Sequence, residues 1–200
     1  MVTPAKLGIR IILGAMLIAA CSRSGRLSFE VESLSQHIPE FVQAARAWRQ
    51  DAYLETATVR IVGEHNPSHL LSAHFVSPSE DLESIAVRLM ADGSVRVDPL
   101  VQTIAIERVD PITESHWMLD SPEALENALD DEGRQFLEGL ESSNCSLLIL
   151  ERESLAPGAP VVWRLLVSEC DTPLVGQTTI IDAMTGELIS RESDLPLSAP

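Results

Sequence analysis

The apolar positions of this chain change twice from a helical spacing to a strand-like spacing. In the first instance an apolar stripe predicts a helix over Pro39–Asp51, with Pro39 in the first turn, where its missing N–H costs nothing. Segments typical of strands follow at Tyr53–Val62, Leu70–Val76, Ser84–Met90 and Ser94–Glu107. Ala91-Asp92-Gly93 has the composition of a tight hairpin turn between the last two.

The second instance begins at Asp120-Ser121-Pro122, a capping residue followed by proline in the first turn. The helical spacing continues to Leu140, and Gly133 is a weak point within it. Strand segments are again predicted, at Ser146–Glu153, Val161–Ser168, Gln177–Asp182 and Glu187–Ser190. One face of the second of these strands is entirely apolar, so we expect it to pack on the helix; it consists of Val161, Trp163, Leu165 and Val167.

The two instances share their order and an offset of 92 residues, which places Tyr53 on Cys145 and Ala91 on Ala183. We favour an internal duplication, and two unrelated α+β segments are the alternative. The expected fold is therefore α+β, with two tandem units that each pack one helix on a three- to four-stranded antiparallel sheet. The first unit would cover residues 35–110 and the second 111–192, followed by a tail at 193–200.

The second instance ends in a turn with a distinctive composition, Asp182, Ala183, Thr185, Gly186 and Glu187. Asp and Thr side chains can bond the backbone of such a turn, while Gly supplies a positive φ. Over about Leu147–Arg191 the chain resembles the PepSY-like domain family, whose members carry this turn. The resemblance implies a small helix-on-sheet fold in an exported bacterial protein, an inhibitory or binding role, and no catalytic residues to carry over.

The N-terminus has the features of an export signal. Lys6 and Arg10 precede an apolar run, Ile11–Ala20, that is shorter than the roughly 20 residues needed to span a bilayer. The run ends in Leu-Ile-Ala-Ala before Cys21, which resembles the lipobox of bacterial lipoproteins. We therefore expect residues 1–20 to be a signal peptide, Cys21 to carry lipid (diacylglyceryl and palmitate), and residues 21–34 to be a tether. An ordinary signal peptide or a membrane anchor is the alternative.

This interpretation predicts an extracytoplasmic, membrane-anchored protein of the bacterial cell envelope, and it leaves the choice of inner or outer membrane open. The whole chain has 14 basic and 30 acidic residues; without Lys6 and Arg10, 12 basic residues remain and the net charge is −18. Such a chain is repelled by nucleic acid, so nucleic-acid binding is excluded, whereas a cationic partner is compatible with it.

Cys145 and Cys170 are the remaining cysteines. If Glu153 and Pro160 flank a hairpin turn, antiparallel pairing places Cys145 opposite Ser168, two residues from Cys170. In an oxidising compartment we expect these two cysteines to form a disulfide bond. Two buried free thiols are the alternative.

No residue pattern indicates catalysis, a metal or a cofactor. His65, His69 and His74 cluster around Pro67, which favours a loop with solvated histidines rather than a zinc site on a helix. The serines lack the surroundings of known nucleophiles. Trp163 and Trp48 fall at core positions, and Trp117 lies where it could fix the second helix to the first unit.

These observations favour a non-enzymatic protein that is held at the membrane through Cys21 and binds or inhibits a protein or peptide, with exposed sheet edges as candidate contact sites. A structural or scaffold lipoprotein is one alternative. A hydrolase whose site lies between the two units, unrecognised in the sequence, is the other.

Overall fold

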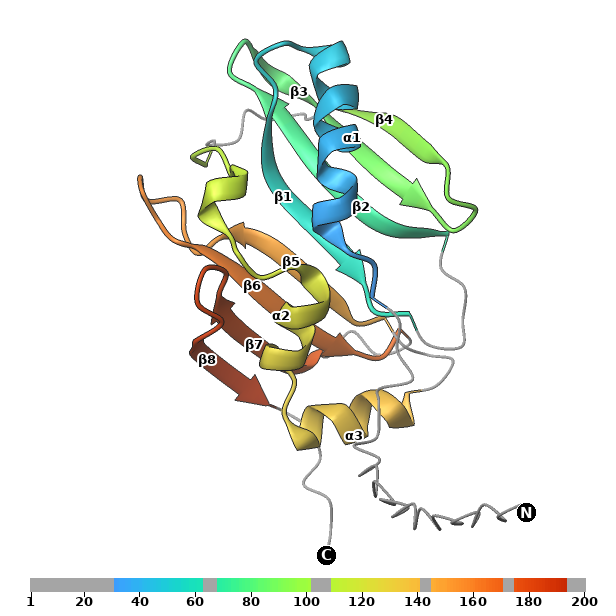
Figure 1. The fold of residues 1–200 in the computed structure, drawn as a ribbon, viewed down its shortest axis with the longest axis vertical. Helices are drawn as coiled ribbons and strands as arrows, with labels where there is room; N and C mark the ends of the chain where they lie inside the picture. The colour runs from blue at the N-terminus through green and yellow to red at the C-terminus, as the bar shows by residue number, and fades with distance from the viewer. Residues whose placement is uncertain (1–30, 63–67, 102–108, 141–144, 171–174, 194–200) are drawn as a thin grey trace, which may run out of the picture.

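The computed structural model describes residues 31–62, 68–101, 109–140, 145–170 and 175–193 (Figure 1). The helical elements in these ranges are α1 (Leu34–Trp48), the 3₁₀ turn η1 (Glu114–His116), α2 (Ser121–Ala128) and α3 (Asp131–Gly139). The strands are β1 (Tyr53–Arg60), β2 (His69–Ser77), β3 (Glu80–Met90), β4 (Val95–Val101), β5 (Leu147–Arg152), β6 (Val161–Ser168), β7 (Val175–Asp182) and β8 (Leu188–Ser193). No helix in these ranges is both long and apolar enough to cross a membrane.

The expectation of two tandem helix-on-sheet units is wrong. All eight strands belong to one antiparallel sheet, in the order β4-β3-β2-β1-β5-β6-β7-β8. Two separate meanders would each leave an open edge, at β1 and at β5, with unpaired backbone groups. These two strands pair with each other instead, so the buried residues of both halves form a single hydrophobic core.

The β1–β5 pairing is locally symmetric. Ala57 lies opposite Leu150, and Thr58 lies opposite Ile149. Ala57 and Ile149 are separated by the same 92 residues that relate the two sequence patterns, as are Thr58 and Leu150. Shifting each residue to its counterpart 92 positions away therefore turns one pair into the other, as a two-fold axis between the strands would do.

Helix α1 begins earlier than the apolar stripe predicts. It starts at Leu34, so Pro39 lies inside the helix rather than in its first turn. The earlier start is stabilised by contacts with the N-terminus of α2, which lies beside it. Ser33 donates a hydrogen bond from Oγ to Oδ2 of Asp120 at 2.5 Å, and the N–H of Leu34 donates to Oγ of Ser121 at 2.9 Å.

The predicted second helix is two helices, and its break is not at Gly133. The chain breaks at Leu129 and Asp130 because Asp130 caps α3, accepting a hydrogen bond from the N–H of Gly133 at 2.7 Å. Arg191 of β8 forms an ion pair with the same carboxylate at 3.0 Å. Gly133 instead packs closely against the end of the Gln177 side chain, which a Cβ atom at this position would displace.

The second half agrees with the sequence in its strand faces and in its cysteines. Val161, Trp163, Leu165 and Val167 of β6 are all buried in the core. The N–H of Cys145 bonds the carbonyl of Ser168 at 3.0 Å, the register that the hairpin predicts. Cys145 and Cys170 form the expected disulfide bond, with their Cα atoms 4.9 Å apart.

The shared helix N-termini make Asp120 important for stability, and we expect Asp120→Ala to lower the free energy of unfolding by about 1–2 kcal/mol. Burial alone would raise the pKa of Asp120, but hydrogen bonds from Ser33, Ser35 and Ser121 outweigh it and lower this pKa below its ordinary value of 3.8. The contribution of Asp120 is therefore complete above about pH 5 and is lost as the pH falls below 3.8.

Urea denaturation between pH 3 and pH 7 measures both effects. Asp131→Ala is the matched control, because Asp131 is an exposed acid in the first turn of α3. The difference between wild type and Asp120→Ala should shrink at the acidic end. A difference that stays constant down to pH 3 would contradict the role given to this carboxylate.

Candidate functional site

The segment that connects the two halves, Asp110–Asp120, is called the crossover segment below. It is attached to the sheet and its hairpins at several places. Ile112 pairs with Leu54 of β1, and its N–H bonds the Leu54 carbonyl at 2.9 Å. The guanidinium of Arg152 donates to the carbonyl of Pro111 at 2.7 Å, and the N–H of Met118 donates to the carbonyl of Ala183 at 3.0 Å.

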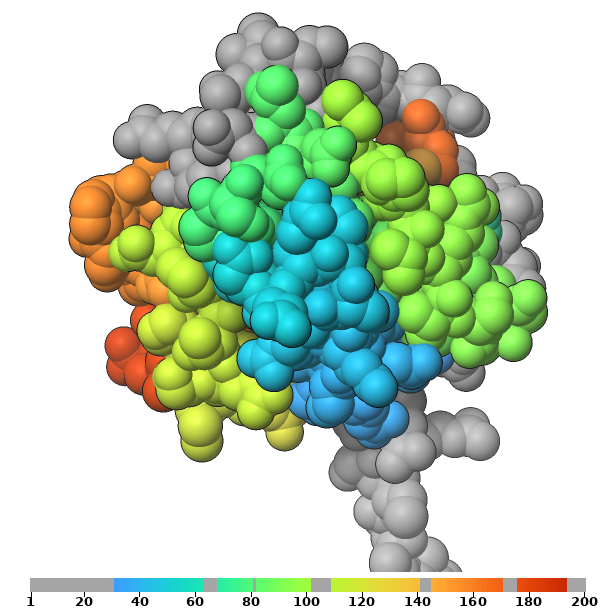
Figure 2. All heavy atoms as spheres, turned by 90° about the horizontal axis from the view of Figure 1, so that it is seen from above, coloured from blue at the N-terminus to red at the C-terminus, as the bar shows by residue number. Residues whose placement is uncertain are grey.

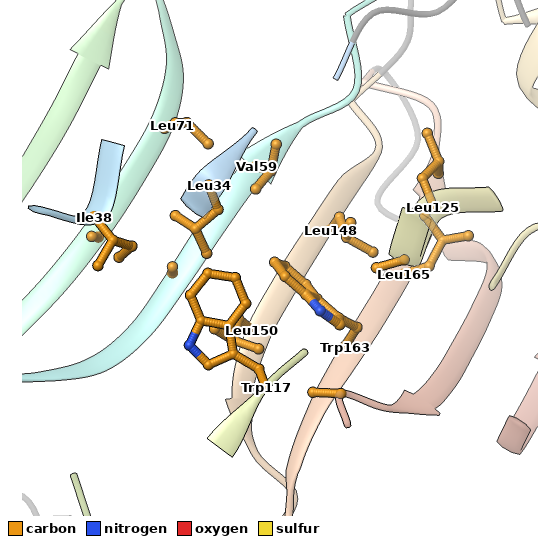
Figure 3. Packing of buried hydrophobic residues seen from close by; sticks show 14 of the residues in the cluster. Leu34, Ile38, Val59, Leu71, Trp117, Leu125, Leu148, Leu150, Trp163 and Leu165 are labelled. Carbon is orange, nitrogen blue, oxygen red and sulfur yellow. The ribbon is translucent and has the colours of Figure 1, made fainter. Parts of the chain in front are cut away.

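Trp117 of the crossover segment lies between the two halves of the core. Figure 3 shows it between Ile38 of α1 and Trp163 of β6. The two indole rings meet edge to face, with centroids 6.2 Å apart and planes at 83°, a favourable aromatic geometry. Trp163 also donates its Nε1–H to the carbonyl of Leu119 at 3.0 Å. Trp117 thus links the halves, as the sequence suggests.

The turn that resembles the PepSY-like motif supports this segment. Oδ1 of Asp182 accepts hydrogen bonds from the backbone N–H groups of Met184 and Thr185, both at 2.8 Å, and Gly186 has a φ of 75°. Ala183 is fully buried and its carbonyl binds the crossover segment. In this structure the turn residues, Glu187 included, stabilise the turn and hold the backbone of the crossover segment.

Two adjoining hollows lie between α1 and the crossover segment. Figure 2 shows this helix and this segment on one surface of the molecule. The first, of about 370 Å³, extends over Val42 and Arg46 of α1 to Tyr53 of β1. The second, of about 320 Å³, extends to Met118 and Asp120. Both are lined by Ile38, Glu114 and Trp117, so we treat them together and call them the groove.

The groove is mostly apolar, and its polar groups have free bonding capacity. No hydrogen bond or ion pair within the described residues engages the side chains of Arg46 or Glu114. Trp117 is only 7% exposed, yet its Nε1–H has no acceptor in the described chain and is not sealed from water. In Figure 3 this nitrogen is on the side of the ring turned away from Trp163.

A third hollow, of about 600 Å³, lies on the other side of η1, between the crossover segment and the β5–β6 hairpin. The cation of this hollow, Arg152, already binds backbone carbonyl groups. It donates to the carbonyls of Pro111 at 2.7 Å and Ala159 at 2.5 Å, and it lies 3.3 Å from Nδ1 of His116. These contacts hold the crossover segment in place, so we assign Arg152 a structural role and do not treat the third hollow as a ligand site.

The histidines do not form the solvated loop cluster that the sequence predicts. His65 lies outside the described residues, but His69 and His74 belong to β2. Burial, followed by the positive charges of Arg60 and Arg88, lowers the pKa of His69.

His74 takes part in a relay of three side chains on the sheet face away from the core. Its Nδ1 lies 2.8 Å from Oε2 of Glu55, and its Nε2 lies 2.8 Å from Oγ of Ser84. This is the order of groups in a serine hydrolase, where histidine takes the hydroxyl proton and the carboxylate orients the ring.

The surroundings of the relay do not suit that chemistry. Ser84 is only 1% exposed, and its strand is paired on both sides, with Val76 and with Leu100. None of the three hollows described above includes Ser84, His74 or Glu55. A nucleophile must reach the carbonyl carbon of its substrate, and a side chain as buried as that of Ser84 cannot do so.

The sequence could not reveal the relay or the groove without strand register. Glu55, His74 and Ser84 come from three strands, and only the β2–β3 register places Ser84 diagonally from His74. The turn at Pro78 and Ser79 places Ser77 opposite Glu80, but the register then shifts by three residues so that Val76 lies opposite Ser84; the turn alone therefore does not predict the contact. The groove depends on where the crossover segment lies, and only the proposed role of Trp117 pointed to it.

The two sheet edges, β4 and β8, expose apolar side chains, namely Val97, Leu100, Val101, Leu188 and Ile189. Strand β4 also carries Pro99 directly after Asp98, and Asp98 forms ion pairs with Arg88 and Arg96. Proline and charge are common devices that prevent strand addition at an edge. The β4 edge is therefore a poorer contact site than the groove.

Two further expectations concern sites. Across residues 31–62, 68–101, 109–140, 145–170 and 175–193, no three His, Cys, Asp or Glu side chains are grouped so that they could hold a metal. Cys21 lies outside these residues, so the structure places neither the cysteine nor the predicted signal peptide.

The chain matches no family model, and no curated protein matches it, so membership of the PepSY-like family stays a resemblance. Among solved structures, it is similar to the crystal structure of a "putative lipoprotein" from Clostridium difficile 630, with a TM-score of 0.41 and 8% sequence identity. That match covers 78% of this chain and 92% of the other. Similarity at this level carries no conclusion about function.

The turn at Gly186 offers a test of how the crossover segment is held. A Cβ atom at Gly186 would lie 2.6 Å from Nδ2 of Asn127 and 2.9 Å from Cδ2 of Leu119, whereas one at Gly93 would meet nothing within 4 Å. Both glycines have a φ near 80°. We expect Gly93→Ala to lower the free energy of unfolding by about 1 kcal/mol and Gly186→Ala by about 2 kcal/mol, since the ends of the Asn127 and Leu119 side chains must also move.

Denaturation by urea measures the two losses directly. Gly93→Ala is the matched control because it carries the same backbone strain without the collision. Equal losses in the two variants would show that the turn does not press on the crossover segment and α2.

Proposed function

We propose that this chain is a lipid-anchored protein of the bacterial cell envelope and a non-enzymatic binding module for a protein or peptide. The anchor is proposed from the sequence alone, on the apolar run and the Leu-Ile-Ala-Ala-Cys stretch that ends at Cys21. A disulfide bond between Cys145 and Cys170 suits such a location, because disulfides persist in oxidising compartments.

The observation that carries the binding role is the groove. Its floor is apolar, and its walls come from a helix and from a segment bonded to the sheet at several places. Preformed apolar hollows with a few free polar groups are typical of binding sites. Free groups of that kind are present in Arg46, Glu114 and the indole N–H of Trp117.

The relay of Ser84, His74 and Glu55 supports a second candidate, a serine hydrolase. We place it below the binding role because its hydroxyl is buried and faces no hollow. On our proposal the relay is a buried polar link between β1, β2 and β3, which satisfies groups that the sheet encloses.

Replacing Cys21 tests the anchor. We expect Cys21→Ser to abolish incorporation of radiolabelled palmitate and to move the protein from the detergent phase to the aqueous phase on Triton X-114 partition. Ser22→Ala, one position further on, should leave both readouts unchanged. Full labelling of the Cys21→Ser protein would rule the lipoprotein proposal out.

Crosslinking of the anchored protein in intact cells separates a binding module from a scaffold. One discrete heteromeric species is the result we expect, whereas crosslinked multimers of this chain alone would favour the scaffold role.

A fluorophosphonate probe tests the hydrolase. We expect no labelling of the folded protein at Ser84, since a phosphonate cannot reach a side chain that is only 1% exposed. Ser84→Ala should lower the free energy of unfolding by about 1 kcal/mol through loss of the bond to His74. Stoichiometric labelling that disappears in both Ser84→Ala and His74→Gln would establish the hydrolase instead.

A further inference from the structure

We propose that the groove between α1 and the crossover segment binds an extended peptide that inserts apolar side chains and places a basic side chain beside Glu114. This inference rests on the binding role proposed above and specifies both the site and the chemistry of the partner.

The groove has the length and shape for a short extended segment. Along α1 it is lined by Ser35, Ile38, Pro39, Val42 and Arg46, which share one helical face. From Ser35 to Arg46 the helix rises about 16 Å, which matches roughly five residues of extended chain. The volumes of about 370 and 320 Å³ are adjoining, so two alternate side chains of one extended segment could enter them, while the residue between them faces outward at the rim, where Glu114 is exposed.

The lining favours apolar side chains at these two points. Ile38, Val42, Phe75, Ile112 and Trp117 supply most of the wall. At the far end, Met118 is 72% exposed, although it follows the nearly buried Trp117. An exposed flexible thioether beside an apolar hollow adapts to different apolar partners.

Charge favours a basic side chain where the two hollows meet, because Glu114 lines both hollows, whereas the one cation in the lining, Arg46, lines only the first. Residues 110–123, which form the crossover segment and the start of α2, contain four acids, Asp110, Glu114, Asp120 and Glu123, and no Lys or Arg. Asp120 is engaged by the N-termini of α1 and α2, whereas Glu114 is exposed and has no partner within the described chain. Glu114 lines both hollows, so a long cationic side chain on the outward-facing residue of the peptide would meet it at the rim where the two hollows join.

The groove also offers a hydrogen-bond donor to a peptide backbone. The free Nε1–H of Trp117 is held in place because its ring packs against Trp163. A donor of fixed direction can bond one carbonyl of an extended chain at little entropic cost. The groove therefore offers three kinds of contact: side-chain insertion, a charge contact and this hydrogen bond. An extended peptide fits this combination better than a compact apolar molecule does.

Three acetylated five-residue peptide amides test the proposal with residues 21–200 in the Cys21→Ser form. One alternates leucine and arginine; in the other two, glutamate replaces arginine or serine replaces leucine. The readout is the indole N–H region of a proton–nitrogen correlation spectrum, where Trp117→Phe assigns the Trp117 signal. The leucine–arginine peptide should move this signal saturably, and the other two should bind at least about tenfold more weakly.

A matched pair of variants isolates the groove from overall charge. Glu114→Lys and Glu123→Lys change the net charge equally, and both side chains are exposed, but only Glu114 lines the groove. Glu114→Lys should weaken the leucine–arginine peptide about tenfold, and Glu123→Lys less than about twofold.

Other outcomes would overturn the inference in recognisable ways. Equal losses of affinity in Glu114→Lys and Glu123→Lys would show that the peptide binds through non-specific charge attraction. Equal affinity for the serine–arginine and leucine–arginine peptides would show the same. Binding that moves other signals but not that of Trp117 would exclude the groove and leave the binding role intact. Movement of the Trp117 signal with protein concentration alone would identify a second copy of this chain as the occupant.

Discussion

The antiparallel pairing of β1 with β5 is the interaction on which the rest of the structure depends. It joins the two four-stranded meanders into one sheet and merges their apolar faces into one core. It also brings the N-termini of α1 and α2 together, where Ser33 and Asp120 bond each other. The crossover segment must then pass over the junction between the halves, and the groove is the space that remains between this segment and α1.

The sequence predicted the parts of the fold that local periodicity determines. The apolar face of β6 and the register that brings Cys145 near Cys170 follow from alternation and one hairpin, and both are present. Helix boundaries were less predictable because partners distant in sequence set them. Ser121 supports the start of α1, and Arg191 binds the aspartate that caps α3.

The main error concerned the edges of the expected sheets. A strand such as β1 has the same alternation whether its outer edge faces water or another strand, so periodicity cannot show that β1 and β5 pair. The same limit hid the functional candidates. The relay needs the register of three strands, and the groove needs a coil segment whose position is set by backbone bonds to Arg152 and Ala183.

The place where the chain enters the fold has a mechanical consequence. The carbonyl of Glu32 accepts a hydrogen bond from Oγ of Ser121 at 2.5 Å, and Ser33 binds Asp120, so the N-terminal end of the described chain is fastened to both helices at the junction. Tension applied from the N-terminal side would load these bonds in parallel. Force would then be shared between the halves before either α1 or the sheet began to yield.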